Sequence, residues 1–199
     1  MARNHWGKGI LWISGLKMNI DGADQLDFSP PRIYVANHSS YMDIPCLFVG
    51  LPVNLYFIAK AEVKKIPFVG LFMMATRMIF VDRKNRMKAV SSMNSAAELI
   101  KKGKSVLVFP EGTRSRDGSV KSFKKGVFVL AYNAGLPVVP VLLEGTNQVM
   151  APDSLMVTPG QVQMTIGQPV MGNDHSSPEA FMNSTREAMI DLKKDTVSA

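Results

Sequence analysis

Cysteine is nearly absent from the sequence, since Cys46 is the only one among 199 residues. A single cysteine excludes an internal disulfide and any metal site built from paired cysteines. The apolar neighbours of Cys46 indicate a small residue of the core. This cysteine usage is typical of a protein in a reducing cytoplasm.

Long hydrophobic runs are absent as well. The uncharged stretch at residues 126–143 contains Pro137 and Pro140 and so indicates a helix, a turn and a strand rather than a transmembrane span. The apolar stretch at residues 10–16 is short and has no small-residue cleavage pattern after it, which argues against a signal peptide. We therefore expect any membrane contact to be peripheral.

Acidic residues are the scarcer charge, with 16 Asp and Glu against 23 Lys and Arg, and the formal net charge is +7. This excess suits an anionic partner such as a membrane, a nucleic acid or a phosphorylated substrate, and equally a soluble protein with a basic surface. Nucleic acid is disfavoured because most aromatic residues lie in apolar runs instead of alternating with cations. The length, without a Gly/Ser-rich linker, indicates one domain.

Short β-branched and apolar runs indicate about seven strands. They lie at residues 16–20, 32–36, 55–59, 78–81, 105–109, 138–143 and 162–166. Helical spacing separates several of them, at 87–100, at 123–134 and after a capping Ser177. This alternation predicts a single α/β domain with a mixed, largely parallel sheet flanked by helices.

The first segment with possible chemistry is Asn-His-Ser-Ser-Tyr-Met-Asp, residues 37–43, directly after an apolar strand. His38 and Asp43 would lie about 140° apart on one regular helix. Pro45, however, restricts the helix to a start near Asp43, so the carboxylate can turn back to the imidazole. Such a pair is a general base for a hydroxyl. The alternatives are a chance spacing and a simple helix cap.

The second segment is Phe-Pro-Glu-Gly-Thr-Arg-Ser, residues 109–115, which also follows an apolar strand. Pro110 ends the strand, Gly112 permits a tight turn, and the guanidinium of Arg114 suits a phosphate or carboxylate. The alternative is a solvated loop with an internal Glu–Arg ion pair. The candidate binding residues here are Glu111, Gly112, Thr113, Arg114 and Ser115.

Together these segments resemble the glycerolipid acyltransferase family, which includes the bacterial 1-acylglycerol-3-phosphate acyltransferases. The family's first motif is His-x4-Asp, and its third motif is matched residue for residue by 109–115. The second motif resembles residues 59–60, 66–70 and 79–83, and the fourth resembles Val-Pro-Val at 139–141. Order and spacing agree over about residues 16–170.

The resemblance implies transfer of a fatty acyl group from acyl-coenzyme A or acyl carrier protein to the sn-2 hydroxyl of lysophosphatidic acid. His38 would take the hydroxyl proton while Asp43 holds the ring, with no metal and no cofactor beyond the acyl donor. Lys60, Arg83 and Arg114 would bind the acceptor, and Glu111 would orient Arg114 or a glycerol hydroxyl. The alternatives are another acceptor, such as a lyso-ornithine lipid or a different lysophospholipid, and a non-catalytic module that binds anionic membrane.

The resemblance also implies a location on the cytoplasmic face of the cell membrane, with an acyltransferase domain at residues 16–199 and a short membrane-contacting segment at 1–15. Many members carry a helical pair or a membrane segment before the first strand, whereas residues 2–15 precede it here. The stretch 68–74 lies between cations and suits a membrane surface or an acyl-chain groove, with a buried helix as the alternative. Glycines disfavour a stable helix in the N-terminal segment. Its apolar anchor candidates are Trp6, Ile10, Leu11, Ile13 and Leu16.

Overall fold

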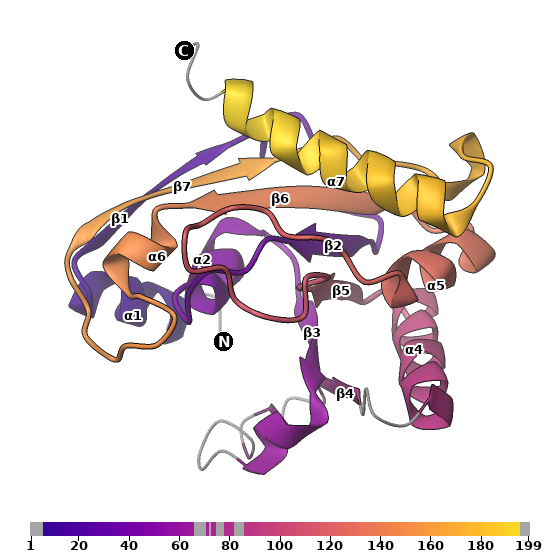
Figure 1. Cartoon of the computed structure of the whole chain (residues 1–199), viewed down its shortest axis with the longest axis horizontal. Coiled ribbons are helices and arrows are strands. Elements are labelled where there is room, and N and C mark those ends of the chain that lie inside the picture. The colour runs from indigo at the N-terminus through magenta and orange to yellow at the C-terminus, as the bar shows by residue number, and fades with distance from the viewer. Residues whose placement is uncertain (1–5, 66–70, 72, 75–77, 82–85, 196–199) are drawn as a thin grey trace.

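The computed structural model describes residues 6–65, 71, 73–74, 78–81 and 86–195 of the chain. A seven-stranded sheet forms the centre of these residues, in the order β1-β7-β6-β2-β5-β3-β4 (Figure 1). The strands are β1 (Leu16–Asp21), β2 (Ile33–Ala36), β3 (Leu55–Lys60), β4 (Ile79–Val81), β5 (Ser105–Val108), β6 (Val138–Glu144) and β7 (Gly160–Ile166). All seven runs expected from the sequence are strands.

The strands run mostly in one direction. Within the described sheet, β6 and β7 are the one antiparallel pair, and the other neighbours are parallel. The carboxyl ends of β2, β3, β5 and β6 therefore lie at one edge, together with the amino ends of β1 and β7. The prediction of a mixed, largely parallel sheet is confirmed, and this edge holds the loops that follow β2 and β5.

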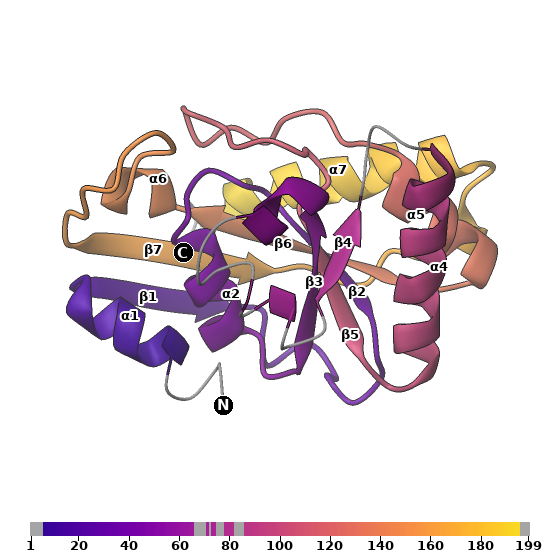
Figure 2. The ribbon, with the colours of Figure 1, turned by 90° about the horizontal axis from the view of Figure 1, so that it is seen from below.

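Helices cover both faces of the sheet. They are α1 (Lys8–Ile13), α2 (Asp43–Gly50), α4 (Arg86–Lys101), α5 (Gly126–Ala134), α6 (Thr146–Val149) and α7 (Pro178–Asp195), with 3₁₀ turns η2 (Ala61–Lys65) and η3 (Gly172–Asp174). Seen from below, α1 and α2 lie in front of the sheet and α7 lies behind it (Figure 2). The buried residues accordingly form two clusters, one with α1 and α2 and one with α4, α5 and α7.

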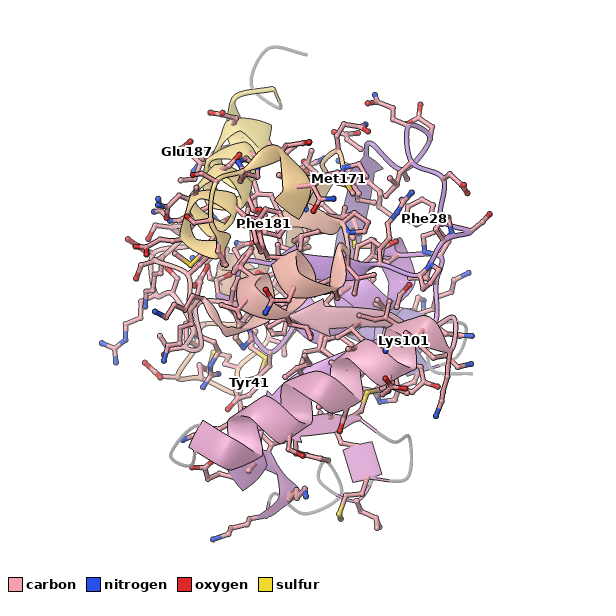
Figure 3. All side chains as sticks on the ribbon, turned by 90° about the vertical axis from the view of Figure 1, so that its right-hand side faces the viewer. Phe28, Tyr41, Lys101, Met171, Phe181 and Glu187 are labelled. Carbon is pink, nitrogen blue, oxygen red and sulfur yellow. The ribbon has the colours of Figure 1, made fainter. Side chains whose placement is uncertain are left out.

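The sheet is buried on both faces, as strand β2 illustrates. Ile33 and Val35 pack into the cluster with α4, α5 and α7, whereas Tyr34 and Ala36 pack into the cluster with α1 and α2. Because both faces are covered, β2 is apolar throughout instead of alternating with polar residues. On the second cluster's side, the fully buried Phe181 of α7, labelled in Figure 3, packs edge-on against Phe128 of α5.

The expectation that glycines prevent a stable N-terminal helix is wrong, because residues 8–13 form α1. The helix is held by burial of Leu11 in the core, and tertiary packing outweighs a low helix propensity. Gly15 follows it with a φ of 62°, a left-handed conformation that suits a helix end. Leu11 and Leu16 are 8% and 7% exposed, so these two anchor candidates belong to the core.

Helix α7 begins after Ser177, as the sequence predicts. The hydroxyl of Ser177 accepts a hydrogen bond from the backbone N–H of Ala180 at 3.1 Å, and Thr185 and Met189 lie buried on the inner face.

No helix among the described residues is long and apolar enough to cross a membrane. Most of the stretch 68–74 lies outside the described residues, although Leu71 is described and is 66% exposed.

Candidate active site

The loop after β2 brings His38 and Asp43 together. Nδ1 of the imidazole lies 2.7 Å from Oδ2 of the carboxylate. The same oxygen accepts the backbone N–H of Ser39 at 2.8 Å and that of Ser40 at 2.9 Å. Helix α2 begins at Asp43, as the position of Pro45 indicated, so the preceding turn can fold back over the carboxylate. Asp43 is fully buried, and its three donors fix the position of the histidine ring.

Side chains of the same loop attach it to β6 and α6. The side-chain amide of Asn37 donates to the carbonyl of Leu143 at 2.8 Å and accepts from the N–H of Leu143 at 2.7 Å. The hydroxyl of Ser39 lies 2.9 Å from that of Thr146, and the hydroxyl of Ser40 donates to a backbone carbonyl at 2.7 Å. The two serines therefore position the loop.

The histidine ring is held on its face as well as at its edge. It stacks on Phe109, the residue after β5, with ring centroids 4.0 Å apart and an angle of 15° between the planes. From Phe109, aromatic contacts continue through Phe57 and Phe48 to Trp6. The side chain of His38 is 18% exposed. Because Asp43 occupies Nδ1, Nε2 is the nitrogen that can take a proton from a bound molecule.

Arg114 reaches the same loop from the turn after β5. Its guanidinium stacks over the ring of Tyr41 at 4.0 Å from the ring centroid, and Nη1 donates to the backbone carbonyl of Pro152. The ammonium group of Lys121 donates to the carbonyl of Arg114 at 2.8 Å. The backbone N–H of Ser115 donates to the carbonyl of His38 at 2.7 Å, so the two motif loops are directly joined.

Glu111 is buried beneath these loops, with 3% of its surface exposed. Burial raises the pKa of Glu111 to about 7, opposed by the nearby backbone N–H groups of Lys121 and His38. Neither carboxylate oxygen accepts a well-formed hydrogen bond from the described residues. The ion pair between Glu111 and Arg114 that the sequence left open as an alternative is therefore not present in this structure.

Comparison with known proteins agrees with this geometry. The family model described as Acyltransferase matches residues 17–144, which include both motif loops and the strands that carry them. The chain belongs to the acyltransferase family. The crystal structure of the 1-acyl-sn-glycerophosphate (LPA) acyltransferase PlsC from Thermotoga maritima is similar, with a TM-score of 0.82 and 33% identity. That match covers 96% of this chain and 76% of the other.

Curated members of the family are also similar in sequence. The chloroplastic 1-acyl-sn-glycerol-3-phosphate acyltransferase of Arabidopsis thaliana is 38% identical over 172 residues, which are 85% of this chain and 47% of that protein. The Saccharomyces cerevisiae 1-acyl-sn-glycerol-3-phosphate acyltransferase is 33% identical over 186 residues, 91% of this chain and 61% of that protein. The chain thus spans roughly half to three fifths of the length of these relatives.

The remaining candidate residues of this acyltransferase-family chain differ in their surroundings. Gly112 has a φ of 76°, and Thr113 is exposed beside it. Ser115 is buried, and its hydroxyl donates to Asp117 at 2.6 Å, which indicates a structural role in the turn. Lys60 ends β3, and its ammonium pairs with Glu62 at 3.2 Å on the surface. Arg83 lies outside the described residues.

Some residues that shape the site were not singled out from the sequence. Tyr41 could have been found from the sequence, because it lies inside the first motif and an aromatic ring is a common stacking partner for a guanidinium such as that of Arg114. Pro152 and Arg186 carried no such signal. Arg186 of α7 donates from Nε to the carbonyl of Lys121 at 3.0 Å and from Nη2 to the carbonyl of Val120 at 2.9 Å, which holds the loop that carries Lys121.

Cys46 is a poor candidate nucleophile in this acyltransferase-family site. Cys46 is fully buried in the core, and burial raises the pKa of its thiol to about 12, so the thiolate is scarce at neutral pH. The described residues contain no group of three or more His, Cys, Asp or Glu side chains arranged to hold a metal ion. Among the described residues of the site, the imidazole of His38 and the buried carboxylate of Asp43 are the candidate catalytic pair.

Proposed function

We propose that this chain transfers a fatty acyl group from a thioester donor to the sn-2 hydroxyl of lysophosphatidic acid, which forms phosphatidic acid. The observation that carries the proposal is the 2.7 Å contact between His38 and the buried Asp43, joined through Ser115 to the loop of Arg114. Family membership supports acyl transfer, and the printed names of the relatives support this acceptor.

In this proposal His38 is the general base. Nε2 takes the proton of the acceptor hydroxyl as its oxygen attacks the thioester carbonyl. The carbon–sulfur bond then breaks, and the imidazolium returns the proton to the departing thiolate. Asp43 stabilises the imidazolium, and its contact with Nδ1 keeps Nε2 unprotonated before the reaction. The buried thiol of Cys46 supports direct transfer over a cysteine-bound acyl intermediate.

Arg114 binds the phosphate of the acceptor in this proposal. Stacking on Tyr41 and the bond to Pro152 hold the guanidinium plane while leaving some of its five N–H donors for an oxyanion. Lys60 and Arg83, from the second motif, would add positive charge around the phosphate. Gly112 and Thr113 would contact the substrate where the loop turns. Fixing base and phosphate site on one scaffold is worth several kcal/mol of positioning.

The acyl donor and the membrane form the last part of the proposal. Acyl-coenzyme A and acyl carrier protein are both suitable donors, because either presents a thioester. The net charge of +7 supports peripheral association with an anionic membrane. The proposed location is the cytoplasmic face of the cell membrane. In that arrangement residues 16–199 carry the chemistry, and the N-terminal segment contributes to membrane contact.

Thiol release from acyl-coenzyme A tests the function directly. The protein is mixed with lysophosphatidic acid, with lysophospholipids that carry larger headgroups, and with a lyso-ornithine lipid. Release that is fastest with lysophosphatidic acid supports the proposal. Faster release with another lysolipid assigns that lysolipid as the acceptor. No release with any acceptor, with either acyl-coenzyme A or acyl carrier protein as donor, favours the non-catalytic membrane-binding module.

A further inference from the structure

Five large apolar side chains are exposed at one end of the molecule. Trp12 and Ile13, at the end of α1, are 83% and 80% exposed. Leu155, Met156 and Val157, between α6 and β7, are 83%, 77% and 38% exposed. We call these five residues the apolar end patch. Exposed apolar side chains that cluster in one place commonly mark an interaction surface, whereas single exposed apolar side chains are normal.

Two strand starts bring the halves of this patch together. Trp12 and Ile13 lie just before β1, and 155–157 lie just before β7, whose first residues Leu16 and Gly160 are register partners. The two segments also approach each other closely just before the strands begin. A Cβ atom added to Gly15 would lie 3.0 Å from the Cβ atom of Pro159. Figures 1 and 2 both show α1 and the segment after α6 at the left-hand end of the molecule.

The segment that carries Leu155 and Met156 is ordered by its own backbone. The N–H of Thr158 donates to the carbonyl of Val149 at 2.8 Å, which closes the loop at its base. Inside it, the N–H of Met156 donates to the hydroxyl of Ser154 at 2.9 Å. These hydrogen bonds order the loop, and its exposed apolar tip is suited to contact with a partner.

The loop that carries the second half of the patch is attached to the candidate active site. Carbonyls at the start of the loop accept hydrogen bonds from Arg114, at Pro152, and from Ser40, at Met150. The amino ends of β1 and β7 share the sheet edge where β2 ends, two residues before His38. A lipid acceptor that leaves a membrane bound at the patch would therefore enter the site at the sheet edge where the imidazole of His38 lies.

Cations lie beside both halves of the patch. Lys8 and Lys17 flank its first half and are exposed, and Arg116 pairs with Asp153 at 2.9 Å beside its second half. Apolar side chains with exposed lysines beside them suit a bilayer with anionic headgroups. A second copy of this chain suits the patch less well, because a two-fold dimer would bring the same cations together.

We propose that the apolar end patch inserts into the interfacial region of an anionic membrane and orients the candidate active site toward it. The proposal rests on the proposed function only in that the acceptor is a lipid. Trp12, Ile13, Leu155 and Met156 enter the headgroup boundary, while Lys8, Lys17 and Arg116 remain at the level of the phosphates.

Vesicle flotation tests the patch with a paired variant, Leu155→Ser with Met156→Ser. Its control is Ile20→Ser with Val129→Ser, which removes two apolar side chains that are 37% and 36% exposed elsewhere. On vesicles of phosphatidylcholine mixed equally with phosphatidylglycerol, we expect the control to bind like the wild type and the loop variant at least tenfold more weakly. Equal binding by the loop variant and the wild type overturns the proposal.

Tryptophan fluorescence provides an independent readout. The sequence has two tryptophans, so Trp6→Phe leaves Trp12 as the only one. We expect the emission of Trp12 to shift to shorter wavelength when these vesicles are added, and an unchanged spectrum with bound protein contradicts the proposal. Sedimentation velocity without lipid tests the second copy, since a wild-type dimer that the loop variant abolishes would assign the patch to self-association.

The failure of the patch and the failure of the proposed function give different results. Flotation requires no catalysis, so a wild-type protein that floats without thiol release refutes the function and leaves the patch standing. With a short-chain lysophosphatidic acid dissolved as monomers, we expect the loop variant to retain wild-type kcat. A loop variant that loses this activity to the same degree as vesicle binding overturns the membrane role and assigns these residues to the fold or the site.

Discussion

Asn37 continues the pairing of strand β2 with its side chain, because its amide pairs with both the backbone N–H and the carbonyl of Leu143 of β6. Both bonds are buried, at 2.8 and 2.7 Å. The chain can therefore leave the sheet after Ala36 without leaving the N–H and carbonyl of Leu143 unpaired. This device fixes where the turn containing His38 begins.

Replacing Asn37 tests that device. Asn37→Ala leaves two buried backbone groups without partners, and we expect it to lower the free energy of unfolding by about 2–4 kcal/mol. The same change should lower kcat, because the turn that carries His38 loses its anchor. Urea unfolding and thiol release measure the two effects. Asn19→Ala, at an exposed position on β1, is the control and should change neither.

Asp43→Asn keeps the size of the side chain and removes its charge. We expect kcat to fall by about 10²–10⁴-fold, because a neutral amide no longer stabilises the imidazolium that forms during transfer. Asp153→Asn makes the same chemical change at an exposed ion pair and should leave kcat unchanged. Comparable kcat values for the two variants, both folded by circular dichroism, would show that the buried carboxylate is only structural.

Arg114 should determine the affinity for a phosphorylated acceptor. Losing a charge-assisted contact costs about 1.5–3 kcal/mol, so Arg114→Ala should raise KM for lysophosphatidic acid by roughly 10–100-fold. Arg114→Lys should not restore it, because an ammonium lacks the planar fork that stacks on Tyr41 and holds Pro152. Arg116→Ala is the control in the same loop, measured with a monomeric acceptor. Unchanged KM in both Arg114 variants would place the phosphate elsewhere.

Glu111 should make stability depend on pH. Its pKa rises from 4.5 to about 7 on folding, so the folded state binds more protons between these values. The contribution of Glu111 to stability is therefore fully present below about pH 4.5 and is lost as the pH rises through 7. Glu111→Gln avoids that loss, and we expect it to be more stable than the wild type by roughly 2–3 kcal/mol at pH 8.

Urea unfolding at pH 5 and pH 8 measures the effect of Glu111→Gln. The gain in stability should be large at pH 8 and small at pH 5. Glu187→Gln, at an exposed position of α7 labelled in Figure 3, is the control and should show no such pH-dependent gain. A destabilised Glu111→Gln protein at pH 8 would mean that the carboxylate is needed in its charged form to hold the loops.

The sequence predicted the sheet and the His38–Asp43 contact because the information is local. A proline three positions into a helix dictates where that helix begins, and the turn before it follows. The contacts of Arg114 with Tyr41 and Pro152 could not be predicted in this way, since they join residues far apart in the chain. Helix α1 was missed because burial of Leu11 against the core outweighs the local preference of its glycines.

In the proposed function, the imidazole of His38, held by Asp43, is the base of an acyl transfer to lysophosphatidic acid. The most direct measurement is the steady-state rate of thiol release from acyl-coenzyme A with lysophosphatidic acid, for the wild type and for His38→Ala. We expect the wild type to turn over and His38→Ala, with wild-type thermal stability and acceptor binding, to lose at least about 10³-fold in kcat. A folded His38→Ala protein that retains near-wild-type turnover would show that His38 is not the base.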